Sequence, residues 1–248
     1  MKNIGDAPNS NSPLGVGGCY KYVFIDLDDT IWDFHANAKS ALHDIYETRK
    51  LNRYFDCFEQ YFSIYAKRNL ELWDLYGKGE ISKVHLSLER FLHPLLEVGI
   101  NNPELALNIG REYLEMLPSR TGLVPFAKEL LEYLYRKYPL TIVSNGFIEV
   151  QYKKLRSANL EHYFTHVVLS EEAKALKPDK RIFEHALNLN KAKASETIMI
   201  GDSYEADIIG AQNAGIDQVY FNPKLNSSDN ELECTFKIRG LDEVLRIL

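Results

Sequence analysis

Two aspartates at the end of an apolar run carry the most chemistry in this sequence. Asp26 and Asp28 follow directly on residues 22–25, Tyr-Val-Phe-Ile, and Thr30 lies two residues further on. Carboxylates at the end of a buried strand are electrostatically costly unless they are paired, neutralised or bound to a metal. Separated by one residue, the two can point into one pocket, one as nucleophile and one as proton carrier. This arrangement indicates phosphoryl transfer through an aspartyl-phosphate, with a divalent cation that holds the charges together.

Three further segments add polar groups, each just after an apolar run that we predict to be a strand. Ser144 and Asn145 offer a hydroxyl and backbone N–H groups for phosphoryl oxygens. Lys177, followed by a proline, offers a fixed ammonium that can neutralise charge on a phosphate and on the nucleophile. Asp202 follows a fourth strand, with Asp207 one helical turn further on, and oxygen ligands of this kind suit Mg²⁺. Each segment alone is a weak signal, but their order at successive strand ends makes a strong joint one.

Short apolar runs and helix-period segments alternate from residue 22 onward and must position these groups. The predicted strands are Tyr22–Leu27, Leu140–Val143, His166–Leu169, Thr197–Ile200 and Gln218–Phe221. The predicted helices are Val124–Lys137, Phe147–Ala158, Lys180–Leu187 and Tyr204–Ala214, and a loop over Asn222–Thr235 precedes a short final strand and helix. The alternation predicts an α/β fold, a Rossmann-like parallel sheet with helices on both faces. Ligands of such sheets bind outside the carboxyl ends of the strands, where the aspartates fall.

The alternation is interrupted between residues 35 and 118, which contain no convincing strand. We predict that this segment is an inserted all-helical cap domain that lies over the pocket. Asn102 before Pro103 is a good helix start. The aromatic residues at helical spacing between Phe55 and Tyr65 are interpreted as the core of the cap. Trp73 and the loop 76–80 are the candidates to face the site. The predicted domains are a flexible tail (1–18), a catalytic core (19–34 and 119–248) and the cap (35–118).

Size and composition narrow the class of protein. The chain has 248 residues, a net charge of −6 and no run of basic residues, which argues against a nucleic-acid polymer or an anionic membrane surface as partner. No apolar stretch approaches the ~20 residues of a membrane helix. The first eighteen residues contain no hydrophobic segment of a secretory signal. Three scattered cysteines without metal-ligand spacing indicate reduced thiols and a cytoplasmic protein.

Taken together, the four segments resemble the motifs of the haloacid dehalogenase superfamily, specifically its phosphatases with a helical cap after the first strand. The resemblance covers the chain from about residue 22 to its end. It implies a Mg²⁺-dependent hydrolase of a small phosphomonoester. It also implies that Asp26 is the nucleophile and a metal ligand. Asp28 would be the general acid and base, with its main-chain carbonyl on the metal.

The resemblance assigns the remaining motif residues as well. Thr30 is similar to the residue that orients Asp28. Thr30, Ser144, Asn145 and Lys177 form the expected phosphate-binding group. Asp202 matches the last Mg²⁺ ligand, and Asp207 corresponds to an acidic position that holds the metal indirectly, in many members through water.

Several functions stay open at this point. Residues 30–34 and 176–183 look most similar to the pyrimidine 5′-nucleotidases that remove non-standard nucleotides, whereas a phosphoglycolate or sugar phosphatase or a phosphomutase needs the same core. A dehalogenase is disfavoured because Asp28 supplies an acid/base group that dehalogenation of this type does without. A phospho-acceptor signalling module is disfavoured because such modules lack an inserted cap and are about half as long. Monomer and homodimer both remain open.

Overall fold

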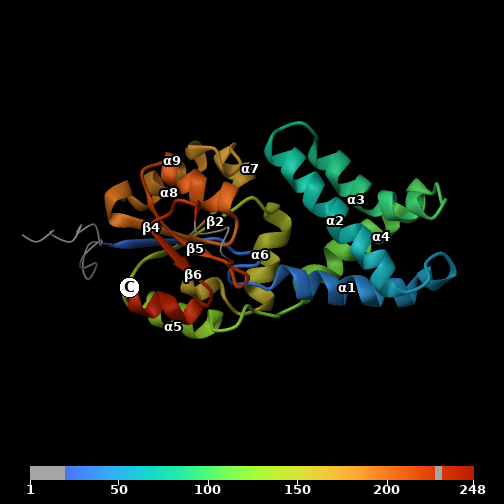
Figure 1. Ribbon diagram of the computed structural model, residues 1–248, viewed down its shortest axis with the longest axis horizontal. Helices are drawn as coiled ribbons and strands as arrows, with labels where there is room; N and C mark the ends of the chain where they lie inside the picture. The colour runs from blue at the N-terminus through green and yellow to red at the C-terminus, as the bar shows by residue number, and fades with distance from the viewer. Residues whose placement is uncertain (1–19, 227–230) are drawn as a thin grey trace, which may run out of the picture.

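This computed structural model describes residues 20–226 and 231–248. A six-stranded parallel sheet forms the centre of its core domain (Figure 1). Its strands are β1 (Tyr22–Ile25), β2 (Leu140–Ser144), β3 (His166–Leu169), β4 (Thr197–Gly201), β5 (Asp217–Phe221) and β6 (Phe236–Ile238). They lie in the order β3-β2-β1-β4-β5-β6, so the direction of winding reverses between β1 and β4. The predicted α/β fold with a parallel sheet is confirmed. The predicted tail 1–18 and Cys19 lie outside the described residues.

The strand β1 is buried on both faces of the sheet, as its unbroken apolar sequence requires. Val23 and Ile25 point into one apolar cluster and Phe24 into a second one on the opposite face, and all three are fully buried. The strand is two residues shorter than predicted. The carbonyl of Leu27 accepts hydrogen bonds from the backbone of Ile31 and Trp32, at 3.0 and 2.8 Å, so the chain already turns there.

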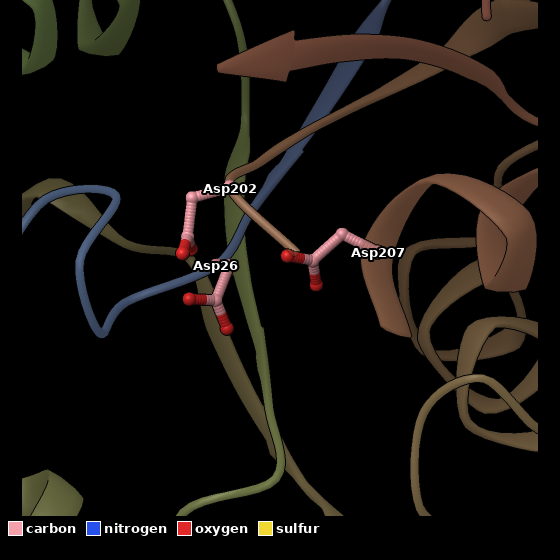
Figure 2. A group of neighbouring side chains, drawn as sticks. All are labelled: Asp26, Asp202 and Asp207. Carbon is pink, nitrogen blue, oxygen red and sulfur yellow. The ribbon is translucent and has the colours of Figure 1, made fainter. Parts of the chain in front are cut away.

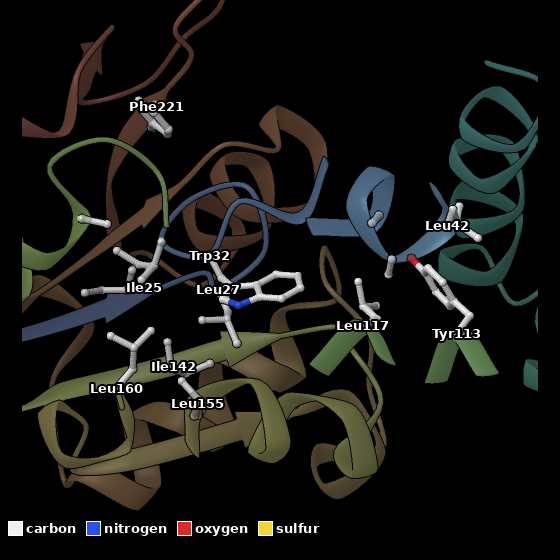
Figure 3. Close-up of a cluster of buried hydrophobic side chains, with 14 of the residues drawn as sticks. Ile25, Leu27, Trp32, Leu42, Tyr113, Leu117, Ile142, Leu155, Leu160 and Phe221 are labelled. Carbon is white, nitrogen blue, oxygen red and sulfur yellow. The ribbon is translucent and has the colours of Figure 1, made fainter. Parts of the chain in front are cut away.

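Helices cover both faces of the sheet (Figure 1). They are α5 (Ala127–Tyr135), α6 (Ile148–Ser157), α7 (Ser170–Ala173), α8 (Lys180–Asn190), α9 (Gly210–Asn213) and a final 3-10 helix (Leu241–Arg246). Shorter 3-10 turns are Leu51–Arg53, Leu117–Ser119, Glu161–Tyr163 and Ala194–Glu196. Figure 3 shows Leu155 of α6 packed under Ile25 and Ile142 of the sheet, whereas α8 and α9 pack on the other face.

One predicted helix differs in kind. Residues Tyr204–Ile209 form a π-helical turn, in which the backbone N–H of Ile208 reaches the carbonyl of Ser203 at 3.3 Å, and α9 follows. Such wide turns are often found at functional sites. Here Asp207, which the turn carries, accepts a hydrogen bond from the backbone N–H of Ser203 at 3.0 Å.

The inserted helices α1 (Phe34–Thr48), α2 (Phe58–Gly77), α3 (Lys83–Glu97) and α4 (Pro103–Met116) lie to one side of the sheet, at the right of Figure 1. The predicted all-helical cap is confirmed. Its aromatic side chains form its core, as predicted: Tyr65 stacks on Phe91 with ring centroids 5.6 Å apart, and Phe58 stacks on Phe62 at 5.7 Å. No helix in the described residues has both the length and the apolar character needed to cross a bilayer.

The two chain segments that connect cap and core lie side by side. The side-chain amide of Asn37 donates to the carbonyl of Gly122 at 2.8 Å and accepts from its N–H at 3.0 Å. The backbone N–H of Asp33 also donates to the Gly122 carbonyl, at 3.1 Å. The entry and the exit of the cap are thus fastened to each other at one point. The exact domain boundaries 34/35 and 118/119 remain predictions.

The start of α4 offers a test of local stability. Asn102 caps it, because its Oδ1 accepts a hydrogen bond from the N–H of Leu105 at 2.9 Å. Asn102→Ala should lower the free energy of unfolding by about 1 kcal/mol, since that N–H loses its partner. Urea denaturation measures the change. The neighbouring Asn101→Ala is the control, because Asn101 is exposed and does not cap the helix. Equal losses in both variants would contradict the capping role.

Candidate active site

The carboxyl ends of three neighbouring strands bring the predicted site residues together. In the sheet, β1 lies between β2 and β4, and Ile25 is paired with both Ile142 and Ile200. Asp26 follows β1 and Asp202 follows β4, so both leave the same edge of the sheet. In Figure 2 the carboxylates of Asp26, Asp202 and Asp207 point toward one another. One carboxylate oxygen from each lies within 4.8 Å of those of the other two.

A buried lysine bridges two of these carboxylates. The Lys177 ammonium donates to Asp26 at 2.5 Å, to Asp207 at 2.6 Å and to the carbonyl of Val143 at 2.8 Å. Only 3% of Lys177 is exposed. Burial opposes its charge, but the carboxylates of Asp207 and Asp26 hold the pKa of Lys177 above its usual value. Lys177 is therefore a permanent cation at the centre of the acidic group.

Negative charge still exceeds positive charge here, and the pKa values respond to it. Burial raises the pKa of Asp26 to about 7, against the opposing effect of Lys177 and with the help of Asp207 and Asp28. Burial also raises the pKa of Asp202 well above its usual value, and the charges of Asp26 and Asp207 add to this shift. An oxygen-only donor set with an excess of carboxylates fits a hard divalent cation such as Mg²⁺.

Close approach of Asp207 depends on a glycine at the end of β4. A Cβ atom on Gly201 would lie 2.4 Å from the carboxyl carbon of Asp207, so no other residue fits without displacing that side chain. Asp207 thus comes within 4.8 Å of the carboxylate oxygens of Asp26 and Asp202. The sequence placed it only indirectly at the metal, and its direct participation is now a proposal.

Asp28 faces helix α6 rather than the acidic group. Its carboxylate accepts hydrogen bonds from Gln151 at 2.9 Å and from Lys154 at 2.6 Å. Lys154 is 2% exposed, and its ammonium lies 4.5 Å from the ring centroid of Trp32. Gln151 and Lys154 were not predicted from the sequence. Two polar residues three apart on the buried side of an amphipathic helix are the signal that could have indicated them.

Thr30 has a different partner from the one expected. Its hydroxyl donates to Asp202 at 2.9 Å, and the residue is fully buried. That it orients Asp28 and binds phosphate stays a prediction. The turn after β1 directs Asp28 toward α6 and Thr30 toward β4, so the Thr30 hydroxyl holds a predicted metal ligand.

Ser144 and Asn145 lie at the end of β2 as predicted, but they differ in what they can bind. The Ser144 oxygen accepts from Gly146 N–H at 3.1 Å and from Gln151 at 2.7 Å, which leaves its own hydroxyl hydrogen for another acceptor. The Asn145 amide is used on both sides by the backbone of Lys177, at 2.7 and 2.9 Å. Its side chain fixes the Lys177 loop, and these two bonds leave the second N–H of its amide and its backbone N–H for a phosphate.

A cavity of about 1010 Å³ joins this edge of the sheet to the cap. Its cap wall includes Phe62, Trp73, Arg90 and Tyr113, and Trp73 packs on Phe147 of the core with ring centroids 5.2 Å apart. The prediction that Trp73 faces the site agrees with this lining, as do Gly77 and Lys78 of the predicted loop. Arg90 was not predicted.

Known proteins are similar to this chain in sequence and in fold. A family model described as a haloacid dehalogenase-like hydrolase matches residues 20–215. The chain is 32% identical to the HAD-hydrolase YfnB of Bacillus subtilis over 92% of its length and 95% of YfnB, and 29% identical to the pyrimidine 5′-nucleotidase PynA of Streptococcus pneumoniae over the same shares.

Solved structures of proteins with a similar fold include relatives of this chain. A structure of YfnB, described as bound to magnesium and as revealing interdomain movement, covers 93% of this chain and 99% of its own, with a TM-score of 0.84 and 30% identity. The L-2-haloacid dehalogenase of Xanthobacter autotrophicus matches 92% of this chain and 98% of its own with a TM-score of 0.73. At 17% identity, that likeness concerns the fold alone.

Proposed function

Because the chain belongs to the haloacid dehalogenase-like hydrolases, we propose that it is a Mg²⁺-dependent phosphomonoesterase that works through a phosphorylated Asp26. The observation that carries this proposal is the group of Asp26, Asp202 and Asp207 around Lys177, in which Asp26, Asp207 and Lys177 are buried and Asp202 is partly exposed. A lone nucleophile would not require this arrangement. Three converging carboxylates and one fixed ammonium suit the binding of both a metal ion and a phosphate.

The first half of the proposed reaction transfers the phosphoryl group to the enzyme. Lys177 holds Oδ1 of Asp26, so Oδ2 is the oxygen that attacks phosphorus. The leaving alkoxide takes a proton from Asp28. Lys154 and Gln151 of α6 hold the Asp28 side chain in place through hydrogen bonds. The free hydroxyl hydrogen of Ser144 and the Lys177 ammonium bind phosphoryl oxygens.

The second half releases phosphate. Asp28, now ionised, takes a proton from water, which attacks the phosphorus of the aspartyl-phosphate and restores the Asp26 carboxylate. When bound by Asp26, Asp202 and Asp207, together with the main-chain carbonyl of Asp28, Mg²⁺ would supply positive charge that stabilises the ionised nucleophile and the transferred phosphoryl group. The lysine then needs to neutralise only the charge that remains.

We propose a nucleoside 5′-monophosphate as the substrate. The support is the likeness to PynA, which is named as a pyrimidine 5′-nucleotidase, and a cavity at the upper end of the ~300–1,000 Å³ that is usual for small-molecule sites. A glycolate or triose phosphate would fill little of it.

Measurement of free phosphate tests the proposed function. The purified chain should release many phosphates per molecule from at least one member of a panel of nucleoside monophosphates, sugar phosphates and short organic phosphates with Mg²⁺. Release should stop with EDTA and return with added Mg²⁺. A phosphomutase would instead yield an isomeric phosphate ester, and a phospho-acceptor module would stop after one turnover. Failure of the whole panel with Mg²⁺ would overturn the proposal.

The stability of the metal-free protein should depend on pH through Asp26. Its pKa rises from 3.8 to about 7 on folding, so between these values the native state holds a proton that the unfolded chain has lost. The contribution of Asp26 to stability is therefore greatest below pH 4 and falls as pH rises toward 7. In EDTA, the free energy of unfolding of wild type should fall more steeply with pH over this range than that of Asp26→Asn, as measured by urea denaturation. Equal pH dependence in the two proteins would contradict the raised pKa of Asp26.

A further inference from the structure

A buried arginine in the cap lacks a carboxylate partner in the part of the chain that the structure describes. Arg90 on α3 is 3% exposed, and within the described residues neither its Nε nor its Nη2 has a hydrogen-bond partner. Its guanidinium lies 4.9 Å from the ring centroid of Phe91 and 5.3 Å from that of Tyr113. These rings cover its faces but accept none of its in-plane N–H groups. A buried charge without a partner is costly, so its acceptor is expected to come from outside the cap.

An unpaired acceptor lies across from it on the neighbouring helix. Asn69 on α2 is 7% exposed, and its Oδ1 has no donor among the described residues. The adjacent residues Arg68 and Glu89 form an ion pair of 3.3 Å between the two helices, which puts Asn69 and Arg90 at the same level of this helical pair. Both line the cavity that also contains Asp26. The cap wall therefore presents a cationic donor and a neutral acceptor together.

The rest of the wall is suited to a flat, apolar group. The rings of Phe62, Tyr65, Trp73 and Phe147 line the same cavity. Its opposite end contains the carboxylates and Lys177, where the phosphate would bind. A ligand that reaches from one end to the other needs a phosphate, a linker and a planar ring whose edge can both accept and donate hydrogen bonds.

We propose that Arg90 and Asn69 determine specificity for a nucleotide base with a lactam edge, that is, a carbonyl beside a ring N–H, as in uracil. Arg90 donates to the carbonyl and Asn69 Oδ1 accepts from the ring N–H. A carboxylate or a second phosphate would satisfy Arg90 but would leave Asn69 Oδ1 against another acceptor. This inference rests on the proposed function, because it takes the phosphate end of the cavity to be the reacting end.

Substrate selectivity tests the inference. In wild type, kcat/KM for uridine 5′-monophosphate should exceed that for ribose 5-phosphate, which lacks the base, and that for cytidine 5′-monophosphate, whose ring edge has donor and acceptor exchanged. Arg90→Met should reduce the uridine-to-ribose ratio by roughly 10- to 100-fold, the usual effect of losing a hydrogen bond to a charged group. Asn69→Leu should reduce the same ratio by removing the acceptor.

Arg68→Met is the matched control. It also removes a cap arginine, but Arg68 is paired with Glu71 and Glu89 and does not line the cavity. The ratio should stay within about twofold of wild type. A merely structural Arg90 would lower the melting temperature and slow all substrates equally, leaving the ratio unchanged, and this result would overturn the inference.

Binding measurements separate this inference from the proposed function. Calorimetry with Asp26→Asn and Mg²⁺ should show tighter binding of uridine 5′-monophosphate than of ribose 5-phosphate, and Arg90→Met or Asn69→Leu in that background should remove the difference. A chain that binds the nucleotide in this way but hydrolyses no phosphate ester supports the base site and refutes the phosphatase. A chain that hydrolyses sugar phosphates and shows no preference for the nucleotide refutes the base site alone.

Discussion

Replacement of Asp26 by asparagine is expected to reduce phosphate release by at least about 10⁴-fold, the scale on which enzymes lose activity when a nucleophile is removed. An amide oxygen does not form the acyl-phosphate, and the change alters volume very little. The ion pair between Lys177 and Asp207, at 2.6 Å, stays in place, so the fold should persist. Steady-state phosphate release with Mg²⁺ measures the loss.

Two comparisons make this prediction sharp. Asp33→Asn is the control, since Asp33 caps α1 through a hydrogen bond to Ala36 N–H and asparagine caps equally well. Its activity should match wild type. Asp26→Asn should also unfold at or above the wild-type denaturant midpoint at pH 8, because an ionised, desolvated carboxylate is lost. Residual turnover above a few per cent would refute covalent catalysis by Asp26.

Lys177→Met should damage both activity and stability. At pH 8 it leaves the buried carboxylates of Asp26 and Asp207 without their cation, and breaking a buried ion pair on one side costs about 3–5 kcal/mol. It also removes charge stabilisation of the transferred phosphoryl group, so kcat/KM should fall by about 10³-fold or more. Urea denaturation in EDTA and phosphate release in Mg²⁺ measure the two losses.

The pH dependence distinguishes this effect from simple loss of packing. Without Lys177 the carboxylates protonate more readily, so the stability deficit of Lys177→Met should shrink as pH is lowered from 8 to 5. Added Mg²⁺ should also reduce it at pH 8. Lys180→Met, at the exposed start of α8, removes only a surface pair with Glu184 and should cost less than about 1 kcal/mol. A deficit that is independent of pH and Mg²⁺ would contradict the electrostatic account.

The sequence was sufficient for the sheet and for the carboxylates at its edge. Short segments that are continuously apolar, or that alternate apolar and polar residues, indicate strands. Because helical segments separate them, few alternatives to a parallel sheet remain. Once strands β1 and β4 are placed side by side, Asp26 and Asp202 must lie near each other. The inserted helices were predictable for the same reason, since residues 35–118 interrupt the alternation.

The partners of the site residues were not predictable in this way. Thr30 binds Asp202, and Asn145 binds the backbone of Lys177, because a turn of a few residues decides where each side chain points. Lys154 and Arg90 come from helices whose rotation toward the cavity follows from packing over the whole domain. Neither residue belongs to a short motif, and local sequence therefore gave no reason to choose them.

The two hydrogen bonds between Asn37 and Gly122 have an evolutionary consequence. Because the chain leaves the core and returns to it at neighbouring positions, the four helices are a single insertion between β1 and α5. A short connecting loop could replace them. An insertion or exchange at that junction can therefore replace these helices without a change in the strands of the sheet. Grafting these helices onto a related core is thus a direct way to transplant substrate preference.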